Sequence, residues 1–237
     1  MTFERGLKVE LDEARPSGME EGSLARVLAR PGGREAWEGA LADARTLIEP
    51  AAAWDFFPVA EIRHKSVVLS RGARLTGGPL AEVVAGAAEL AVAVCTVGQA
   101  ISTRIKEHQQ ARKLLRGLLL DELGSWSVDV VRQQVCRRLQ DDAESANLRV
   151  STSLSPGESE WPLEDQAVLF SLLDPGFIGV SLGPTMLMTP MKSLSFIVGR
   201  GTQLTGHEAG THCDYCVIRE RCRYRCLREA SEAGDSG

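Results

Sequence analysis

Two stretches of the chain place their apolar residues three or four positions apart, which is the spacing of one face of a helix. In the first, residues 34–48, the apolar stripe stops before Pro50, where we expect the helix to end. The second, residues 112–140, repeats leucine, tryptophan and valine at this spacing, with arginine and glutamine between them. It predicts the longest helix of the chain, which Gly124 is expected to divide into two pieces.

Short, continuously apolar runs bounded by turn residues predict strands. The clearest are residues 67–69 and 89–96, and further β-like runs follow between residues 178 and 198. Loops are expected at residues 54–58 and 148–161, and further helices from Pro79, after Gly98 and over residues 162–173. Strands and helices do not alternate regularly, and we find no internal repeat. We therefore predict the α+β class, with a mixed or antiparallel sheet flanked by helices.

Composition narrows the class of protein. The 237 residues are 43% hydrophobic and 25% charged, which suits a globular chain with a proper core. The formal net charge of −5 provides no overall attraction for nucleic acid, so we expect no nucleic-acid partner. No run of about eighteen apolar residues predicts a membrane span, and the N-terminus lacks the apolar region of a signal peptide. We expect a cytoplasmic protein, in which thiols stay reduced.

Four of the six cysteines are concentrated near the C-terminus, as Cys213, Cys216, Cys222 and Cys226. The spacing C-x2-C-x5-C-x3-C is typical of an inorganic centre rather than of disulfides. A [4Fe–4S] cluster needs four ligands, which this run can supply, and arginines in the same loop can offset its negative charge. Structural zinc is the alternative, although its ligand pairs are usually separated by a dozen residues or more. The spacing leaves open whether the centre is redox-active or structural.

The remaining cysteines and two of the histidines receive no functional role. Cys95 and Cys136 fall in apolar surroundings, where a buried free cysteine usually contributes only packing. His64 and His108 fall in polar segments, and we expect both to be exposed.

Between residues 155 and 199 the chain resembles a known family. The segments that carry the resemblance are Ser155-Pro156-Gly157, Trp161-Pro162-Leu163-Glu164-Asp165-Gln166, Ile178-Gly179-Val180 and Met186-x-Met188-x-Pro190-x-Lys192-Ser193. They resemble the activation domain of vitamin B12-dependent methionine synthase. The similarity is closer to stand-alone relatives of that domain, which carry a cysteine-rich C-terminus, and it extends over residues 65–226.

The resemblance implies a domain that binds S-adenosylmethionine and docks on a corrinoid protein. There, oxidised cob(II)alamin is rescued by one electron, from a donor such as flavodoxin or ferredoxin, and a methyl group. The residues that the resemblance places at the ligand are Asp129, Glu122, Ser155, Gly157, Glu158 and Ser193.

The ligand-binding motif of the family is altered in this chain. Its loop R-x-x-P-G-Y has Ser153 at the arginine position and Glu158 at the tyrosine position. Its second block, L-T-E-S, is Leu182-Gly183-Pro184-Thr185 here, so the glutamate is missing. These departures remove a carboxylate-binding fork and two polar partners. They leave open whether the S-adenosylmethionine pocket is kept, or is lost or rebuilt on a scaffold that still docks on a corrinoid protein.

We expect three parts: a helical segment at residues 1–60, an activation-domain-like domain at 61–205, and a cysteine-rich metal loop with its tail at 206–237. The leading hypothesis is an accessory protein of corrinoid-dependent methyl transfer that docks on a methionine synthase core or another cobalamin-binding protein. The alternative is a non-enzymatic subunit or scaffold whose metal site only fixes the C-terminus.

Overall fold

The computed structural model describes residues 1–11, 14, 23–158 and 160–205. Its strands are β1 (Thr2–Arg5), β2 (Ala51–Arg63), β3 (Ser66–Leu69), β4 (Arg74–Thr76), β5 (Glu89–Thr96), β6 (Arg149–Val150), β7 (Ser181–Leu182), β8 (Met188–Thr189) and β9 (Ser193–Gly201). Its α-helices are α1 (Ser23–Leu28), α2 (Gly33–Leu47), α3 (Leu80–Val83), α4 (Gln99–Gln110), α5 (Leu114–Ser145) and α6 (Gln166–Leu172). Two short 3-10 helices, η2 (Leu163–Asp165) and η3 (Gly176–Ile178), complete the described elements.

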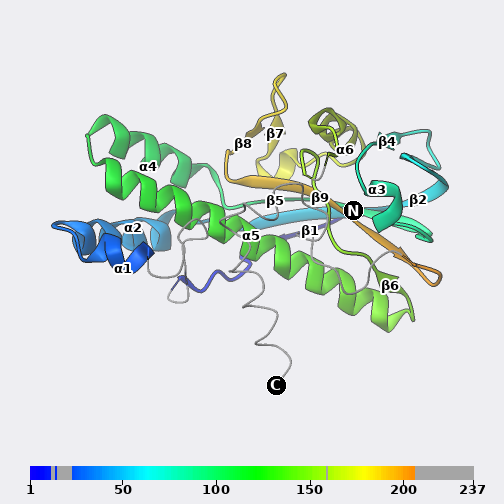
Figure 1. Cartoon of the computed structure of the whole chain (residues 1–237), viewed down its shortest axis with the longest axis horizontal. Helices are drawn as coiled ribbons and strands as arrows, with labels where there is room; N and C mark the ends of the chain where they lie inside the picture. The colour runs from blue at the N-terminus through cyan, green and yellow to red at the C-terminus, as the bar shows by residue number, and fades with distance from the viewer. Residues whose placement is uncertain (12–13, 15–22, 159, 206–237) are drawn as a thin grey trace.

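The strands form one large sheet in the order β4-β3-β2-β5-β9-β6, with β1 paired to β2 beside β3 (Figure 1). All pairings among the described strands are antiparallel, and β7 and β8 form a separate hairpin. Helices α2, α4 and α5 cover one face of the sheet, and α3 and α6 cover the other. The predicted α+β class with an antiparallel sheet flanked by helices is confirmed.

Strand β5 is central because seven of its eight residues are buried, which suits a strand covered on both faces. It pairs with β2 along one edge, from Ala51 opposite Thr96 to Pro58 opposite Glu89, and with β9 along the other. The predicted strand at residues 89–96 is therefore confirmed in position as well as in type.

The loop predicted at residues 54–58 is wrong, because these residues lie inside β2. Trp54 packs into the core below the sheet and Phe57 into the core above it, as in a strand buried on both faces. Pro58 is tolerated because its nitrogen points to the edge of β2 away from β5, between the residues that pair with β1, up to Trp54, and those that pair with β3, from Val59. The domain boundary expected after residue 60 falls within this same strand.

Helix α5 is continuous over 32 residues, so the break predicted at Gly124 is wrong. A Cβ at Gly124 would lie 3.1 Å from Cδ1 of Ile101 and 3.2 Å from Cγ of Lys192. The glycine therefore allows α4 and the start of β9 to approach the helix closely. No helix among the described residues is long and apolar enough to cross a membrane.

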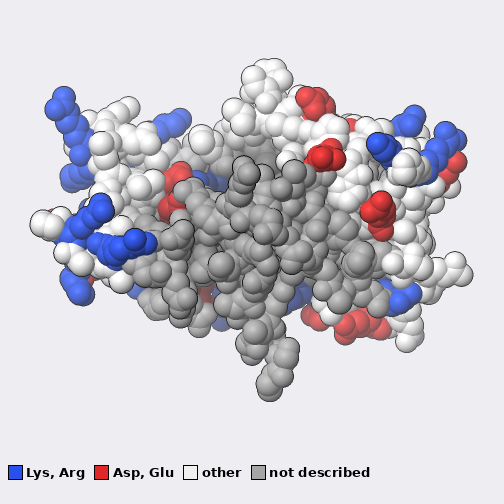
Figure 2. Space-filling model, in the orientation of Figure 1, with Lys and Arg blue, Asp and Glu red and all other residues white. Residues whose placement is uncertain are grey.

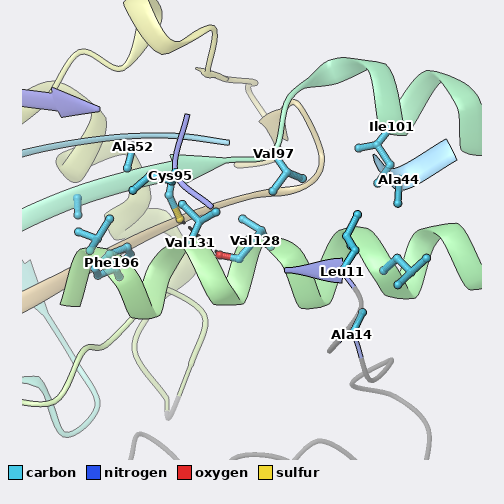
Figure 3. Close-up of a cluster of buried hydrophobic side chains, with 14 of the residues drawn as sticks. Leu11, Ala14, Ala44, Ala52, Cys95, Val97, Ile101, Val128, Val131 and Phe196 are labelled. Atoms are coloured by element: carbon cyan, nitrogen blue, oxygen red, sulfur yellow. Dashed lines mark hydrogen bonds between the residues drawn. The ribbon is translucent and has the colours of Figure 1, made fainter. Parts of the chain in front are cut away.

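The core between the sheet and helices α2, α4 and α5 contains Ala52 and Cys95 from the sheet and Ile101, Val128 and Val131 from the helices (Figure 3). The Cys95 thiol lies 3.8 Å from the Val128 carbonyl oxygen, so this cysteine is a packed core residue, as predicted. Burial raises its pKa, which keeps the thiol protonated and unreactive.

The second core lies on the opposite face, under α3 and α6. Trp161 is almost fully buried there, and its ring N–H donates to Asp165 across 2.8 Å. The helix predicted over residues 162–173 is present as η2 followed directly by α6. Leu154 belongs to the same core and forms a single antiparallel bridge with Ile197 of β9.

Candidate functional site

A row of polar side chains runs along the middle of α5. Asp121, Ser125 and Asp129 are four residues apart and Arg132 follows three residues later, so all four lie on one side of the helix. Lys192, immediately before β9, donates to Asp121 across 2.9 Å and to Ser125 across 2.8 Å. Asp121 and Ser125 therefore already have Lys192 as a partner. The other two residues of the row, Asp129 and Arg132, form an ion pair with each other.

Arg132 is a buried guanidinium, with 5% of its side chain exposed. Its Nη2 donates to Asp129 Oδ1 across 2.7 Å, and its Nη1 reaches Ser153 Oγ at 3.4 Å. Burial would lower its pKa, but the negative charges of Asp129 and Glu158 outweigh that effect and raise it. Arg132 is therefore charged in the folded protein, and the nearby carboxylates stabilise that charge.

The segment from Ser153 to Glu158 faces Arg132 because of how it joins the sheet. Leu154 points into the core on the far side of the sheet. Side chains of an extended segment alternate, so Ser153 and Ser155 point to the side that carries α5. The turn then closes at Gly157, whose φ of +90° is a conformation suited to glycine.

Ser155 provides an observation that points to a missing partner. The residue is 6% exposed, and its hydroxyl oxygen has no hydrogen-bond partner within the described part of the chain. Its backbone N–H donates to Glu158 Oε2 across 3.2 Å. A buried hydroxyl without a partner is costly, because it has lost water and gained nothing in return. The hydroxyl belongs to the same segment as Ser153, which contacts Arg132, and a buried hydroxyl of this kind is what a site that receives a polar ligand would show.

Four of the six residues predicted at the ligand therefore come together: Asp129 on α5, and Ser155, Gly157 and Glu158 in the facing turn. Glu122 is buried on α5, seven residues before Asp129, which places the two on the same side about 10 Å apart along the helix axis. Ser193 lies elsewhere. It pairs with Thr96 on the sheet face opposite α5, and its hydroxyl oxygen lies 2.7 Å from the Pro190 carbonyl oxygen and 2.9 Å from Thr96 Oγ1.

Arg132 was not predicted from the sequence. It belongs to a helical face rich in arginine and glutamine, where each residue looked solvated. Its one distinguishing signal is the spacing of three residues from Asp129, which places a carboxylate and a guanidinium together on the buried side.

The predicted metal ligands Cys213, Cys216, Cys222 and Cys226 lie outside the described residues. Within residues 1–11, 14, 23–158 and 160–205, no three His, Cys, Asp or Glu residues are grouped so as to hold a metal ion. Cys136 is near Arg132 and Ser153, and burial raises the pKa of its thiol despite both neighbours.

A second buried polar cluster joins the three helices below the sheet. Asp43 of α2 is 6% exposed and accepts hydrogen bonds from Arg104 at 2.6 Å, from Arg116 at 2.7 and 2.9 Å, and is 2.7 Å from His108 Nε2. The expectation that His108 is exposed is wrong, because this contact holds it in the interface. Basic side chains also gather on the surface at this end of the molecule (Figure 2).

Two glycines make room for this cluster. A Cβ at Gly39 would lie 2.7 Å from the guanidinium carbon of Arg116, and one at Gly117 would lie 3.3 Å from Cβ of His108. The hydrogen bonds of the cluster join helices α2, α4 and α5 to one another. We interpret it as a clamp that fixes the start of α5, the helix that carries Asp129 and Arg132.

The antiparallel sheet, with its long helix along one face and the short hairpin beyond it, is the fold of a methionine synthase reactivation domain. The MetH reactivation domain bound to AdoHcy superposes on this chain with a TM-score of 0.57, covering 80% of this chain and 71% of that one. The aligned residues are 13% identical, so the likeness concerns the fold. No protein-family model and no curated protein matches the chain.

Proposed function

We propose that this protein is an accessory component of corrinoid-dependent methyl transfer of the methionine synthase type. It docks on a cobalamin-binding protein and supports the reductive reactivation of cob(II)alamin. The fold supports this proposal, since the MetH reactivation domain shares it. In the reaction, cob(II)alamin gains one electron and takes a methyl group from the sulfonium of S-adenosylmethionine. The products are methylcobalamin and AdoHcy.

The residues around Arg132 fit a ligand of this chemical type. The MetH reactivation domain is bound to AdoHcy, a zwitterion with one carboxylate and one ammonium group. This chain offers a guanidinium to a carboxylate, and the carboxylates of Asp129 and Glu158 to cationic groups. The hydroxyl of Ser155, which has no partner within the described part of the chain, is the single observation that most favours a ligand here over a purely structural ion pair.

The four C-terminal cysteines are proposed to hold a [4Fe–4S] cluster, and flavodoxin or ferredoxin is the proposed electron donor. When bound, such a cluster supplies one-electron redox chemistry. Zinc in the same four thiolates would make the site structural, and the protein would then fit the scaffold hypothesis.

The test uses a methionine synthase fragment that contains its cobalamin domain and lacks its own reactivation domain. The full chain, purified without oxygen, is titrated into this fragment by calorimetry, with the cobalamin in the cob(II) state. We expect saturable binding, and the absence of binding would remove the proposed role. The matched control is the same fragment without cobalamin, which should bind more weakly if the corrin face is part of the contact.

A further inference from the structure

We propose that Arg132 binds the carboxylate of the ligand, and so replaces from α5 the guanidinium that the loop lacks at Ser153. This inference rests on the proposed function, because it concerns the ligand of that site. It gives Arg132 a role in ligand recognition that its position in the sequence does not indicate.

The geometry supports the replacement. Arg132 Nη1 is 3.4 Å from Ser153 Oγ, which is longer than an ordinary hydrogen bond of 2.7 to 3.2 Å. The guanidinium therefore reaches the position of the altered loop residue but finds only a weak neutral acceptor there. A ligand carboxylate next to Ser153 would accept a shorter, charge-assisted bond from the same donor.

The burial of Arg132 favours the binding of a ligand carboxylate at Nη1. With 5% of its side chain exposed, Arg132 has lost most of its hydration, so an added anionic partner does not compete with bulk water. Its ion pair with Asp129 uses Nη2, whereas the contact with Ser153 uses Nη1. The ligand can therefore bind at Nη1 while Asp129 keeps the side chain in place.

Ser155 provides the independent observation that a ligand belongs here. Its buried hydroxyl has no partner among the described residues, and alternation along the extended segment places it on the same side as Ser153. The proposal gives this O–H group an acceptor, namely the ligand carboxylate that Arg132 binds. If Arg132 served only to neutralise Asp129, the orphaned hydroxyl would remain unexplained.

The test compares S-adenosylmethionine with decarboxylated S-adenosylmethionine, which lacks only the carboxylate. Calorimetry on the full chain should show that the wild type binds S-adenosylmethionine at least about tenfold more tightly than the decarboxylated form. Arg132→Met should remove that preference by weakening S-adenosylmethionine alone. Arg132→Lys keeps the charge but loses the fork, so it should keep part of the preference and also serves if the methionine variant does not fold.

Arg137→Met is the matched control, because Arg137 is an exposed arginine of the same helix and should leave both affinities unchanged. Ser155→Ala should weaken S-adenosylmethionine and spare the decarboxylated form. Equal binding of the two ligands by the wild type, or an equal loss of both in Arg132→Lys, would overturn the role of Arg132 and leave the proposed function standing. If the wild type binds neither ligand, both this inference and the proposed ligand are wrong.

Discussion

Replacing Asp43 with asparagine tests whether the buried cluster under the sheet clamps α5. The substitution keeps the size of the side chain but removes its charge and puts an NH2 group where the carboxylate accepts hydrogen bonds. The amide keeps one acceptor oxygen, so only the donors at the other oxygen position lose their acceptor; with the oxygen facing Arg104, these are His108 and Arg116. Breaking a buried ion pair by removing one partner typically costs about 3–5 kcal/mol.

The loss of stability in Asp43→Asn should be smaller than the loss from breaking a fully buried ion pair. Arg104 and Arg116 keep 37% and 28% of their side chains exposed, so both can recover part of their hydration, whereas His108 at 8% cannot. We expect a loss of about 2–3 kcal/mol in the free energy of unfolding. For a chain of this size, that corresponds to a decrease of roughly 4–12 °C in melting temperature.

The difference in stability between the wild type and Asp43→Asn should decrease as the pH falls. Burial would raise the pKa of Asp43, but hydrogen bonds from His108 and Arg116 and the charges of Arg116 and Arg104 lower it below its ordinary value. The unfolded carboxyl, with a pKa of about 3.9, therefore takes up its proton first as the pH falls. The stabilisation by Asp43 is complete above about pH 5 and is lost as the pH falls through 4 toward the lower folded-state pKa.

Urea unfolding followed by circular dichroism at pH 7 and below pH 4 measures both the loss of stability and its dependence on pH. Asp43→Asn should be less stable than the wild type at pH 7, and the gap should narrow in acid. The control is Asp141→Asn, which changes an exposed aspartate of α5 and should have little effect at either pH. A loss at pH 7 no larger than in this control, or a gap that widens in acid, would refute the clamp.

Three further predictions follow from the structure. Gly124→Leu should destabilise the protein by about 1–3 kcal/mol in thermal unfolding, because its side chain would collide with Ile101 and Lys192; a gain, as helix propensity alone would give, would contradict the packing. Two carboxylates lie near one guanidinium at the proposed ligand site, so calorimetry at low salt should show cationic S-adenosylmethionine binding about threefold more tightly than neutral AdoHcy, and equal affinities would argue against this charge balance. Protein purified without oxygen should contain about four iron atoms per chain, Cys222→Ser should lose them and Cys136→Ser should retain them; zinc in place of iron would favour the scaffold hypothesis.

The fold was predictable where local pattern and tertiary environment agree. The strand at residues 89–96 has an apolar pattern that matches its observed burial. The helix predicted at residues 34–48 is present as α2, although the charged Asp43 is buried there and Trp37 is only partly buried. The prediction failed at Pro58 and Gly124, where local preferences indicate a loop and a break. In both places the deciding factor is a neighbour distant in sequence: the pairing of β2 with β5 at Pro58, and the approach of Ile101 and Lys192 at Gly124.

The candidate site was predictable only in part, for the same reason. The resemblance indicated Asp129, Ser155 and Glu158, and the structure brings these residues together. It did not indicate Arg132, and the polar surroundings of His108 concealed its burial against Asp43. A charged residue on a helix is buried or exposed according to what packs against it, and a single sequence does not contain that information.

The central claim is that this fold serves the reactivation of a corrinoid protein. The most direct measurement is the rate at which the cob(II)alamin signal of a methionine synthase fragment without its own reactivation domain disappears, followed by electron paramagnetic resonance in the presence of a reductant and S-adenosylmethionine. We predict that adding this protein accelerates the loss of that signal and yields methylcobalamin and AdoHcy in equal amounts. An unchanged rate at saturating protein, with no methylcobalamin formed, would contradict the claim.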